Sequence, residues 1–142
     1  TLKKSNLSIF EDFISKNFLK SRVYVDQAFN YDSEISSIAF NKTFFEDIKK
    51  IQPFGTGNPV PTFFFKDLRI IKTNVLNNKH ISLILKSKIG FSIKSISFNS
   101  VNSKIGEYLL NYKKDLHVIG QINENFWNNK NTLQLTIRDL IL

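Results

Sequence analysis

Cysteine is absent from the 142 residues, so disulfide bridges and thiolate metal sites are excluded. The two histidines, His80 and His117, are far apart and show no metal-ligand spacing. No apolar run approaches the roughly 20 residues that a membrane-spanning helix needs, and the first residues show no signal-peptide pattern. We therefore expect a cytoplasmic protein with no membrane partner. The chain also lacks an initiating methionine, as expected of a fragment of a longer protein.

A catalytic set of residues is also missing. The acidic residues of the second part of the chain fall on different predicted elements: Asp67, Glu107, Asp115, Glu124 and Asp139. They form no carboxylate cluster, and no Ser/His/Asp set or HExxH motif can be assembled. We therefore expect no catalytic residue, no metal and no cofactor within this chain.

Positive charge is what the chain has in excess, and most of it lies in the second part. The formal net charge is +8, of which residues 1–52 carry +1 and residues 53–142 carry +7. A basic domain suits a polyanion such as nucleic acid or a membrane surface. The alternative is a lysine-rich surface that is simply solvated.

The first 52 residues predict a small helix–strand–helix segment. Apolar side chains recur at helical spacing in both helical stretches, for example Phe10, Phe13 and Phe18 in the first and Phe44, Ile48 and Ile51 in the second. Ser5 or Asn6 is placed to cap the first helix. The predicted elements are a helix over 5–20, a strand over 22–29, a polar turn over 30–34 and a helix over 43–52.

A break follows at residues 53–61, PFGTGNPVP. Three prolines and two glycines in nine residues exclude a helix or a central strand. The segment lacks the lysine of a phosphate-binding P-loop, so we interpret it as a structural hinge with Phe54 as its packing anchor. The hinge residues are Pro53, Phe54, Gly55, Gly57, Asn58 and Pro59.

Residues 62–142 show the order β-β-β-α-β-β, which is the order of an OB fold. The predicted elements are strands over 63–75, 79–87 and 91–98, a helix over 101–112, a strand over 116–122, a loop over 123–131 and a strand from 133. Asn77-Asn78 predicts a tight turn between the first two strands. The third strand changes phase, with Phe91 and Ile93 on one parity and Ile96 and Phe98 on the other, which predicts a bulge. The fold class is mainly β with flanking helices (α+β), built on a five-stranded OB-type barrel.

Such a barrel binds ligands on the face of its second and third strands, between the loops that join strands 1–2 and 4–5. Single-strand binding needs cations for the phosphates and aromatic rings for the bases. The candidates are Trp127, Phe126 and Lys130 in the 4–5 loop, Lys79 and His80 at the 1–2 turn, Lys86, Lys88 and Lys94 on or between strands 2 and 3, and Arg138 on strand 5. Trp127 has an alternative role as a plug in the barrel end. The cations have an alternative as solvated surface charges, and His80 as a hydrogen-bonding residue across the hairpin.

The run from Pro53 to Phe63 resembles the PFGxGNPxPxF signature of RecJ-type single-stranded-DNA-specific exonucleases. The similarity continues, in order, at residues 79–83, 96–98, 122–124 and 133–135. It departs from the family where glycines of the 1–2 turn and the 4–5 loop appear as Asn78 and Asn129. Asparagine tolerates positive φ, so we expect both turns to persist.

This resemblance implies an accessory domain of a larger enzyme. It assigns residues 1–52 to the end of a DHHA1-type domain with its connector, 53–61 to a hinge and 62–142 to an OB domain that binds single-stranded DNA. The catalytic core, outside this chain, would degrade the strand 5′ to 3′ with manganese or magnesium, in DNA repair and recombination. The alternative is a protein-interaction module for an acidic partner, such as the tail of a single-stranded-DNA-binding protein. A weaker alternative is an OB domain for RNA or oligosaccharide.

Overall fold

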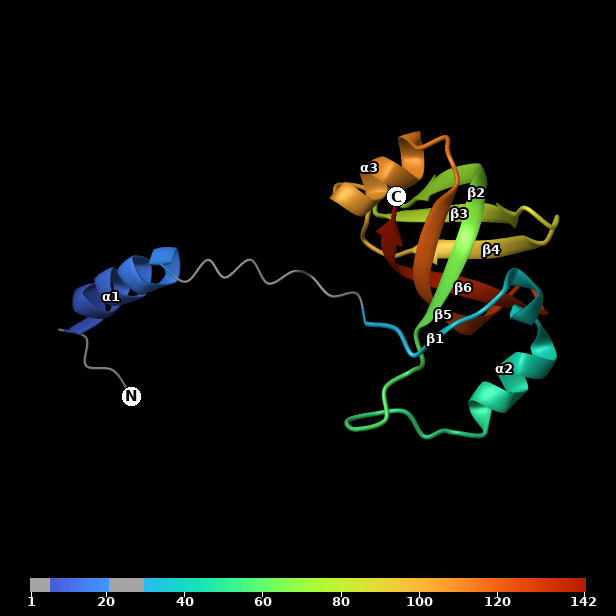
Figure 1. The fold of residues 1–142 in the computed structure, drawn as a ribbon, viewed down its shortest axis with the longest axis horizontal. Coiled ribbons are helices and arrows are strands. Elements are labelled where there is room, and N and C mark those ends of the chain that lie inside the picture. The colour runs from blue at the N-terminus through green and yellow to red at the C-terminus, as the bar shows by residue number, and fades with distance from the viewer. Residues whose placement is uncertain (1–5, 21–29) are drawn as a thin grey trace.

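The computed structural model describes residues 6–20 and 30–142, and the side chains of 14–20 are left out of that description. Helix α1 (Leu7–Lys20) forms where helical spacing predicted it (Figure 1). The strand predicted over 22–29 lies outside the described residues.

Five strands close into the predicted OB barrel (Figure 1). They are β2 (Phe63–Leu76), β3 (His80–Ser87), β4 (Ser92–Ser97), β5 (Leu116–Trp127) and β6 (Lys130–Ile141). Neighbours pair antiparallel except β4 and β6, which are parallel, and β2 pairs with β5 to close the barrel. Helix α3 (Lys104–Asn111) lies between β4 and β5 in the chain, as predicted.

Strand β2 is long and bent, because it takes part in both sides of the barrel. Its first residues pair with β5 and its later residues pair with β3. The register shifts between Phe65 and Leu68 and again between Ile70 and Lys72, and Asp67 adopts a φ of 53°. Bulges of this kind increase the local twist and let one strand turn the corner of a barrel.

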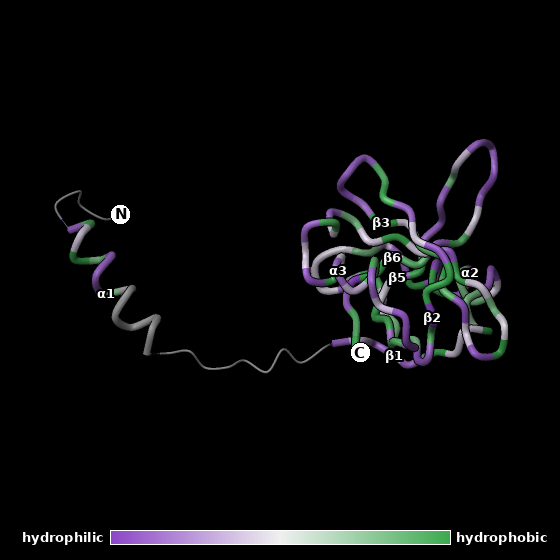
Figure 2. The backbone as a smooth tube through the Cα atoms, turned by 90° about the horizontal axis from the view of Figure 1, so that it is seen from above, coloured by the Kyte–Doolittle hydropathy of each residue, from purple (hydrophilic) through white to green (hydrophobic). Residues whose placement is uncertain are grey.

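The barrel interior is filled by alternating apolar side chains. Figure 2 colours the backbone by hydropathy and shows hydrophobic stretches where the strands of the barrel lie. The fully buried ones include Phe65, Leu68, Ile81, Leu85, Ile93, Leu116, Val118 and Leu135. Each such burial contributes about 1.5–3 kcal/mol. Gly120 allows β5 and β6 to approach closely, since a Cβ there would lie 2.7 Å from the carbonyl oxygen of Thr136.

Both tight turns form with asparagine. Asn77 and Asn78 have φ values of 50° and 53°, and Asn128 and Asn129 have values of 51° and 59°. Two consecutive residues of positive φ are typical of the type I′ turn of a two-residue hairpin. The expectation that asparagine would preserve these turns is confirmed.

The bulge predicted in the third strand is wrong. The β3–β4 register runs without a shift from Ile81↔Ser97 to Lys86↔Ser92. The inward positions after Ile93 are Ser95 and Ser97, both buried, and the Ser95 hydroxyl donates to the Ile93 carbonyl at 3.3 Å. The apolar pattern misled because small serines occupy the interior and Phe98 points outward.

The loop predicted over 123–131 is also wrong. Strands β5 and β6 stay paired from His117↔Ile141 to Trp127↔Lys130, so only Asn128 and Asn129 form the turn. This end of the hairpin is polar on both faces, and the alternation that marks a half-buried strand is therefore missing. Thr136 on β6 is only 8% exposed, and its hydroxyl accepts a hydrogen bond from Asn123 Nδ2 at 3.0 Å.

The segment before the barrel packs onto it. Strand β1 (Ser33–Glu34), which the sequence did not predict, pairs parallel with the start of β2. Short 3-10 helix η2 (Ser37–Ala39) and helix α2 (Lys42–Lys49) follow. Phe45 and Ile48 join the barrel core, whereas Ile51 lies beyond the end of α2 and is 53% exposed, contrary to the predicted stripe. Residues 33–48 and the barrel thus share one core.

The proline-glycine segment is held by its own polar contacts. The Asn58 side-chain amide donates to the carbonyls of Ile51 and Pro53 at 2.8 and 2.9 Å. Gly55 and Asn58 form a backbone bridge, and Gly57 between them has a φ of 84°. Phe54 packs partly buried against the core. The segment is ordered by these contacts, and motion about it stays a prediction.

Candidate nucleic-acid interface

A groove of about 400 Å³ lies on the outer surface of β2, β3 and β4, beside the β5–β6 hairpin. Its floor follows from the strand register. Ile84 on β3 pairs with Lys72 on β2 and with Lys94 on β4, so these three side chains form one outward row. Side chains of paired strands lie about 4.5–5.5 Å apart at their Cβ atoms. The two lysines therefore lie on either side of Ile84.

The hairpin supplies the other wall of the groove. Trp127, the last residue of β5, pairs with Lys130, the first residue of β6, and both line the groove together with Gln134. Gln134 comes next to Lys94 because β4 and β6 run parallel, with Ser95 opposite Leu135. The hairpin therefore brings an aromatic ring and a third lysine to the row of Lys72 and Lys94.

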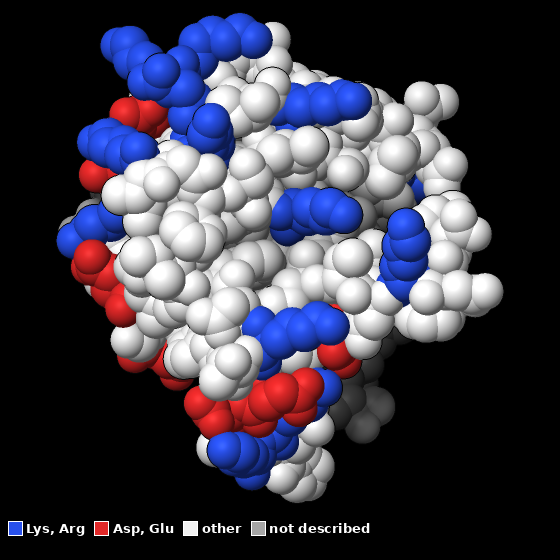
Figure 3. Space-filling model, turned by 90° about the vertical axis from the view of Figure 1, so that its right-hand side faces the viewer, with Lys and Arg blue, Asp and Glu red and all other residues white. Residues whose placement is uncertain are grey.

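The charge of the groove is entirely positive. Its lining contains Lys72, Lys94 and Lys130 and no Asp or Glu. None of the three is a member of an ion pair among the described residues. Figure 3 shows a face where lysine and arginine side chains cross the middle, while most acidic side chains gather toward the left edge and the lower part. Cations without a carboxylate partner are free to meet an anion from outside.

Trp127 does not plug the barrel. Its side chain is exposed, with 78% of the residue accessible to solvent, so that alternative is wrong. Phe126 is 71% exposed but alternates to the opposite face of the hairpin and does not line the groove. Of the two neighbouring aromatic residues, only Trp127 is placed beside the lysines.

His80 takes the structural role that the sequence left open. Its Nδ1 accepts a hydrogen bond of 2.9 Å from the Asn99 backbone N–H, across the end of the β3–β4 pair. Its ring stands edge-on to Phe98, with centroids 5.3 Å apart. Lys79 precedes it at the β2–β3 turn, is exposed, and does not line the groove.

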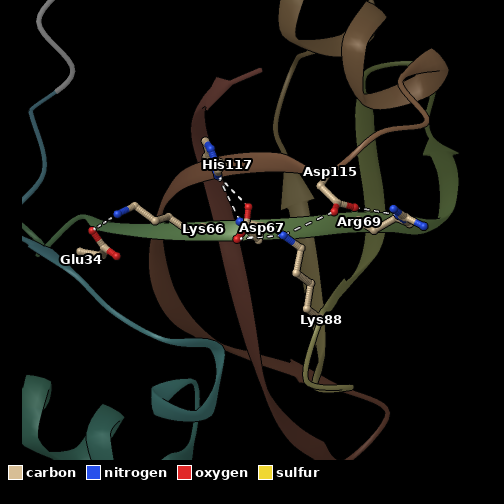
Figure 4. A network of polar contacts seen from close by, with 7 residues as sticks. All are labelled: Glu34, Lys66, Asp67, Arg69, Lys88, Asp115 and His117. Atoms are coloured by element: carbon tan, nitrogen blue, oxygen red, sulfur yellow. Dashed lines mark hydrogen bonds and ion pairs between the residues drawn. The ribbon is translucent and has the colours of Figure 1, made fainter.

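Lys86 and Lys88 lie away from the groove. They line a second hollow together with Arg69, Asp67 and Asp115. Lys88 Nζ lies 3.1 Å from Asp67 Oδ2, and Arg69 Nε lies 2.8 Å from Asp115 Oδ1 (Figure 4). The prediction that Lys88 clusters with Lys94 is therefore wrong, because Lys88 pairs with two carboxylates, Asp67 on β2 and Asp115 just before β5.

Lys66, which precedes Asp67 on β2, also has a carboxylate partner (Figure 4). Its Nζ lies 2.7 Å from Glu34 Oε2. The hydrogen bond to Glu34 raises the pKa of the Lys66 ammonium above its ordinary value. A cation engaged in this way contributes less to binding an external phosphate than one without a partner.

Arg138 is anchored to a neighbouring strand. Its Nε and Nη2 donate to Gln121 Oε1 at 3.1 and 2.7 Å. Gln121 in turn donates from Nε2 to the Val60 carbonyl at 3.1 Å, which ties the end of the proline-glycine segment to β5. Arg138 is exposed on the outer surface of β6 but does not line the groove.

Two residues of this surface escaped the sequence analysis. Lys72 belongs to a strand whose bulge shifts the parity, so alternation from Phe63 does not show where it points. Phe98 was placed with the inward residues, yet it is 55% exposed. The phase break in the third strand was the available signal, and an outward Phe98 explains it without a bulge.

The described residues hold no group of three or more His, Cys, Asp or Glu side chains able to bind a metal ion. The manganese or magnesium implied by the resemblance therefore has no fitting site in the described part of the chain. Within the same residues, no helix has the length and apolar character needed to cross a membrane.

Comparison with known proteins agrees with this architecture. The family model of the RecJ OB domain matches residues 31–139. RecJ from Thermus thermophilus in complex with Mg²⁺ superposes with a TM-score of 0.67 at 16% identity, covering 100% of this chain and 21% of that one. Its complex with Mn²⁺ gives 0.69 at 16% identity, covering 99% and 20%. The chain thus spans about a fifth of those structures, which at this identity show the fold alone. No match was found among curated proteins.

Proposed function

Because the chain belongs to the RecJ OB domain family, we propose that its groove binds single-stranded DNA. The observation that carries the proposal is the row of Lys72, Lys94 and Lys130, which have no carboxylate partner among the described residues and lie beside an exposed Trp127. Lysines that line a groove follow the phosphates, and a tryptophan face stacks on any base. The groove therefore suits a strand whose bases are unpaired and whose sequence is not specified.

The same proposal gives the domain its place in a larger enzyme. Since the chain spans about a fifth of the solved RecJ structures, we propose that it holds substrate for a catalytic core elsewhere. We propose that the core is a RecJ-type exonuclease, which degrades single strands from the 5′ end with manganese or magnesium. In this arrangement the OB domain binds the strand, and the core binds the metal ion and degrades the strand.

The test is fluorescence anisotropy of the 142-residue chain with a labelled single-stranded DNA, a duplex and an RNA of equal length, across a salt series. We expect the tightest binding to single-stranded DNA, weakening steeply with salt because counterions are released. A triple variant, Lys72→Gln with Lys94→Gln and Lys130→Gln, is expected to flatten the slope of log K against log salt by about 2, at roughly 0.7 for each phosphate that is no longer neutralised.

The matched control removes the same charge from cations that already have partners: Lys50→Gln, Lys66→Gln and Lys88→Gln, whose partners are Asp47, Glu34 and Asp67. This triple variant is expected to leave the slope nearly unchanged. Equal effects of the two triple variants would show that net charge alone drives binding. Absence of binding by the wild-type chain at low salt would overturn the proposal.

An acidic protein partner is the alternative, since the same three lysines would attract a carboxylate-rich tail. An acidic peptide added to the DNA complex separates the two functions. Displacement of the DNA by the peptide would support a shared surface. A peptide that neither binds nor competes would contradict the alternative.

A further inference from the structure

Phe98 lies outside the groove lining, at the end of the sheet opposite Trp127. It directly follows β4, on the parity of the outward Lys94, and the β3–β4 register continued by one residue places it opposite His80. The residue is 55% exposed, although a phenylalanine gains most from burial. An exposed aromatic ring on the same surface as unpartnered lysines is the second component that single-strand binding requires.

The surroundings of Phe98 hold it in place. The His80 ring stands edge-on to it, with centroids 5.3 Å apart and planes at 77°. The next residue, Asn99, has a φ of 51° and donates its N–H to His80 Nδ1 at 2.9 Å. Ser100 is buried and its hydroxyl donates to the Ser97 carbonyl at 3.1 Å. A ring ordered in advance loses little conformational entropy when a base stacks on it.

The register gives the distance between the two aromatic residues. Trp127 lies opposite Lys130, and Lys94 lies beside Gln134, four residues further along β6. Phe98 is four residues beyond Lys94 in the direction of the parallel strand β4. Eight residues at about 3.3 Å each place the two rings about 26 Å apart along the direction of β4 and β6. At the roughly 3.4 Å spacing of a stacked strand this corresponds to about eight nucleotides, and to fewer when the strand is extended.

We propose that Phe98, braced by His80, is a second base-stacking site, and that the groove binds a strand long enough to reach both Phe98 and Trp127. This inference rests on the proposed function, because it requires the groove to bind DNA. It adds a length requirement: oligonucleotides that reach one ring bind weakly, and those that reach both bind tightly. The estimated length agrees with the roughly 4–16 nucleotides that OB folds occupy.

The experiment measures the affinity of the 142-residue chain for oligothymidylates of 3 to 15 nucleotides. Phe98→Ala is expected to weaken binding of the longest strands about 5- to 150-fold, the effect of losing one stacked base. For the shortest strands the loss is expected to stay within about twofold, since Trp127 still binds them. Phe98→Trp is expected to restore the affinity and to keep the inference testable if Phe98→Ala folds poorly.

The matched control is Phe91→Ala, which removes an exposed phenylalanine just before the start of β4, on the parity of the inward Ile93, and is expected to change nothing. Wild-type affinity of Phe98→Ala for long strands would overturn the inference and leave the proposed function intact. A loss of equal size at every length would overturn it too, since a second site acts only on strands that reach it. If the wild-type chain binds no oligothymidylate, the proposed function itself fails.

Discussion

Replacing Gly106 by alanine tests how helix α3 packs on the barrel. Alanine is the better helix former by about 1 kcal/mol, so helix propensity alone predicts a gain in stability. The structure predicts the opposite, because a Cβ at this position would lie 1.8 Å from the Ser100 carbonyl oxygen and 2.7 Å from its carbon. Both are backbone atoms, so relief requires the helix and the 98–101 turn to move apart.

The magnitude follows from what that shift disturbs. The Ser100 carbonyl accepts hydrogen bonds from the Ser103 hydroxyl at 2.8 Å and the Ser103 N–H at 3.0 Å. Overpacking costs about 1–3 kcal/mol and each hydrogen bond that breaks costs about 0.5–1.5 kcal/mol. After subtraction of the gain in helix propensity, we expect Gly106→Ala to lower the free energy of unfolding by about 1–5 kcal/mol.

Urea denaturation followed by circular dichroism measures this change. The control is Gly55→Ala, because nothing lies within 4 Å of the position that its Cβ would take. Its effect is expected to stay below about 1 kcal/mol. If Gly106→Ala proved as stable as the wild type, the close packing of α3 against Ser100 would be refuted.

Three further predictions test the hairpin, the proline-glycine segment and an ion pair. Trp127→Ala is expected to weaken single-stranded DNA binding about 5- to 150-fold in an anisotropy titration, whereas Phe126→Ala on the opposite face is expected to have no effect; equal losses would contradict the assignment of faces. Asn58→Ala removes two hydrogen bonds to backbone carbonyls and is expected to lower the free energy of unfolding by about 1–2 kcal/mol in urea; an unchanged midpoint would show that the segment is ordered by other contacts. The raised pKa of Lys66 means that its pair with Glu34 stabilises the fold fully below the ordinary lysine pKa and is lost as pH rises through the folded value. Glu34→Gln is expected to lower the Lys66 pKa in an NMR titration, and an unchanged value would refute the pair.

Much of the fold could be predicted because local rules and tertiary packing agree in it. The strict alternation of Ile81, Leu83 and Leu85 matches a strand with one face in the core, and all three are buried. The asparagine pairs at 77–78 and 128–129 have the positive φ values that tight hairpins require. The order of strands and helix between these two turns can be predicted along the chain, because it does not depend on contacts between distant residues.

The candidate site was less accessible to prediction. Lysine and aromatic residue types indicated a nucleic-acid surface, but the partner of each cation is a long-range property. Lys88 meets Asp67 only because β3 pairs with β2, with Ser87 opposite Leu68. Arg138 meets Gln121 only because β6 pairs with β5. Sequence order contains neither contact, so the free cations could not be told from the paired ones.

The sequence by itself determined the class of this protein: a cysteine-free, basic OB barrel with a break rich in proline and glycine before it. Those properties depend on composition, on periodicity and on residues near one another in the chain. Only the tertiary structure decided which side chains share the groove. The β2 bulge sets the direction of Lys72, and parallel pairing of β4 with β6 brings Lys94 beside Gln134 and the hairpin. Register between distant strands is a collective outcome of packing, and one residue of slip would turn every side chain to the other face.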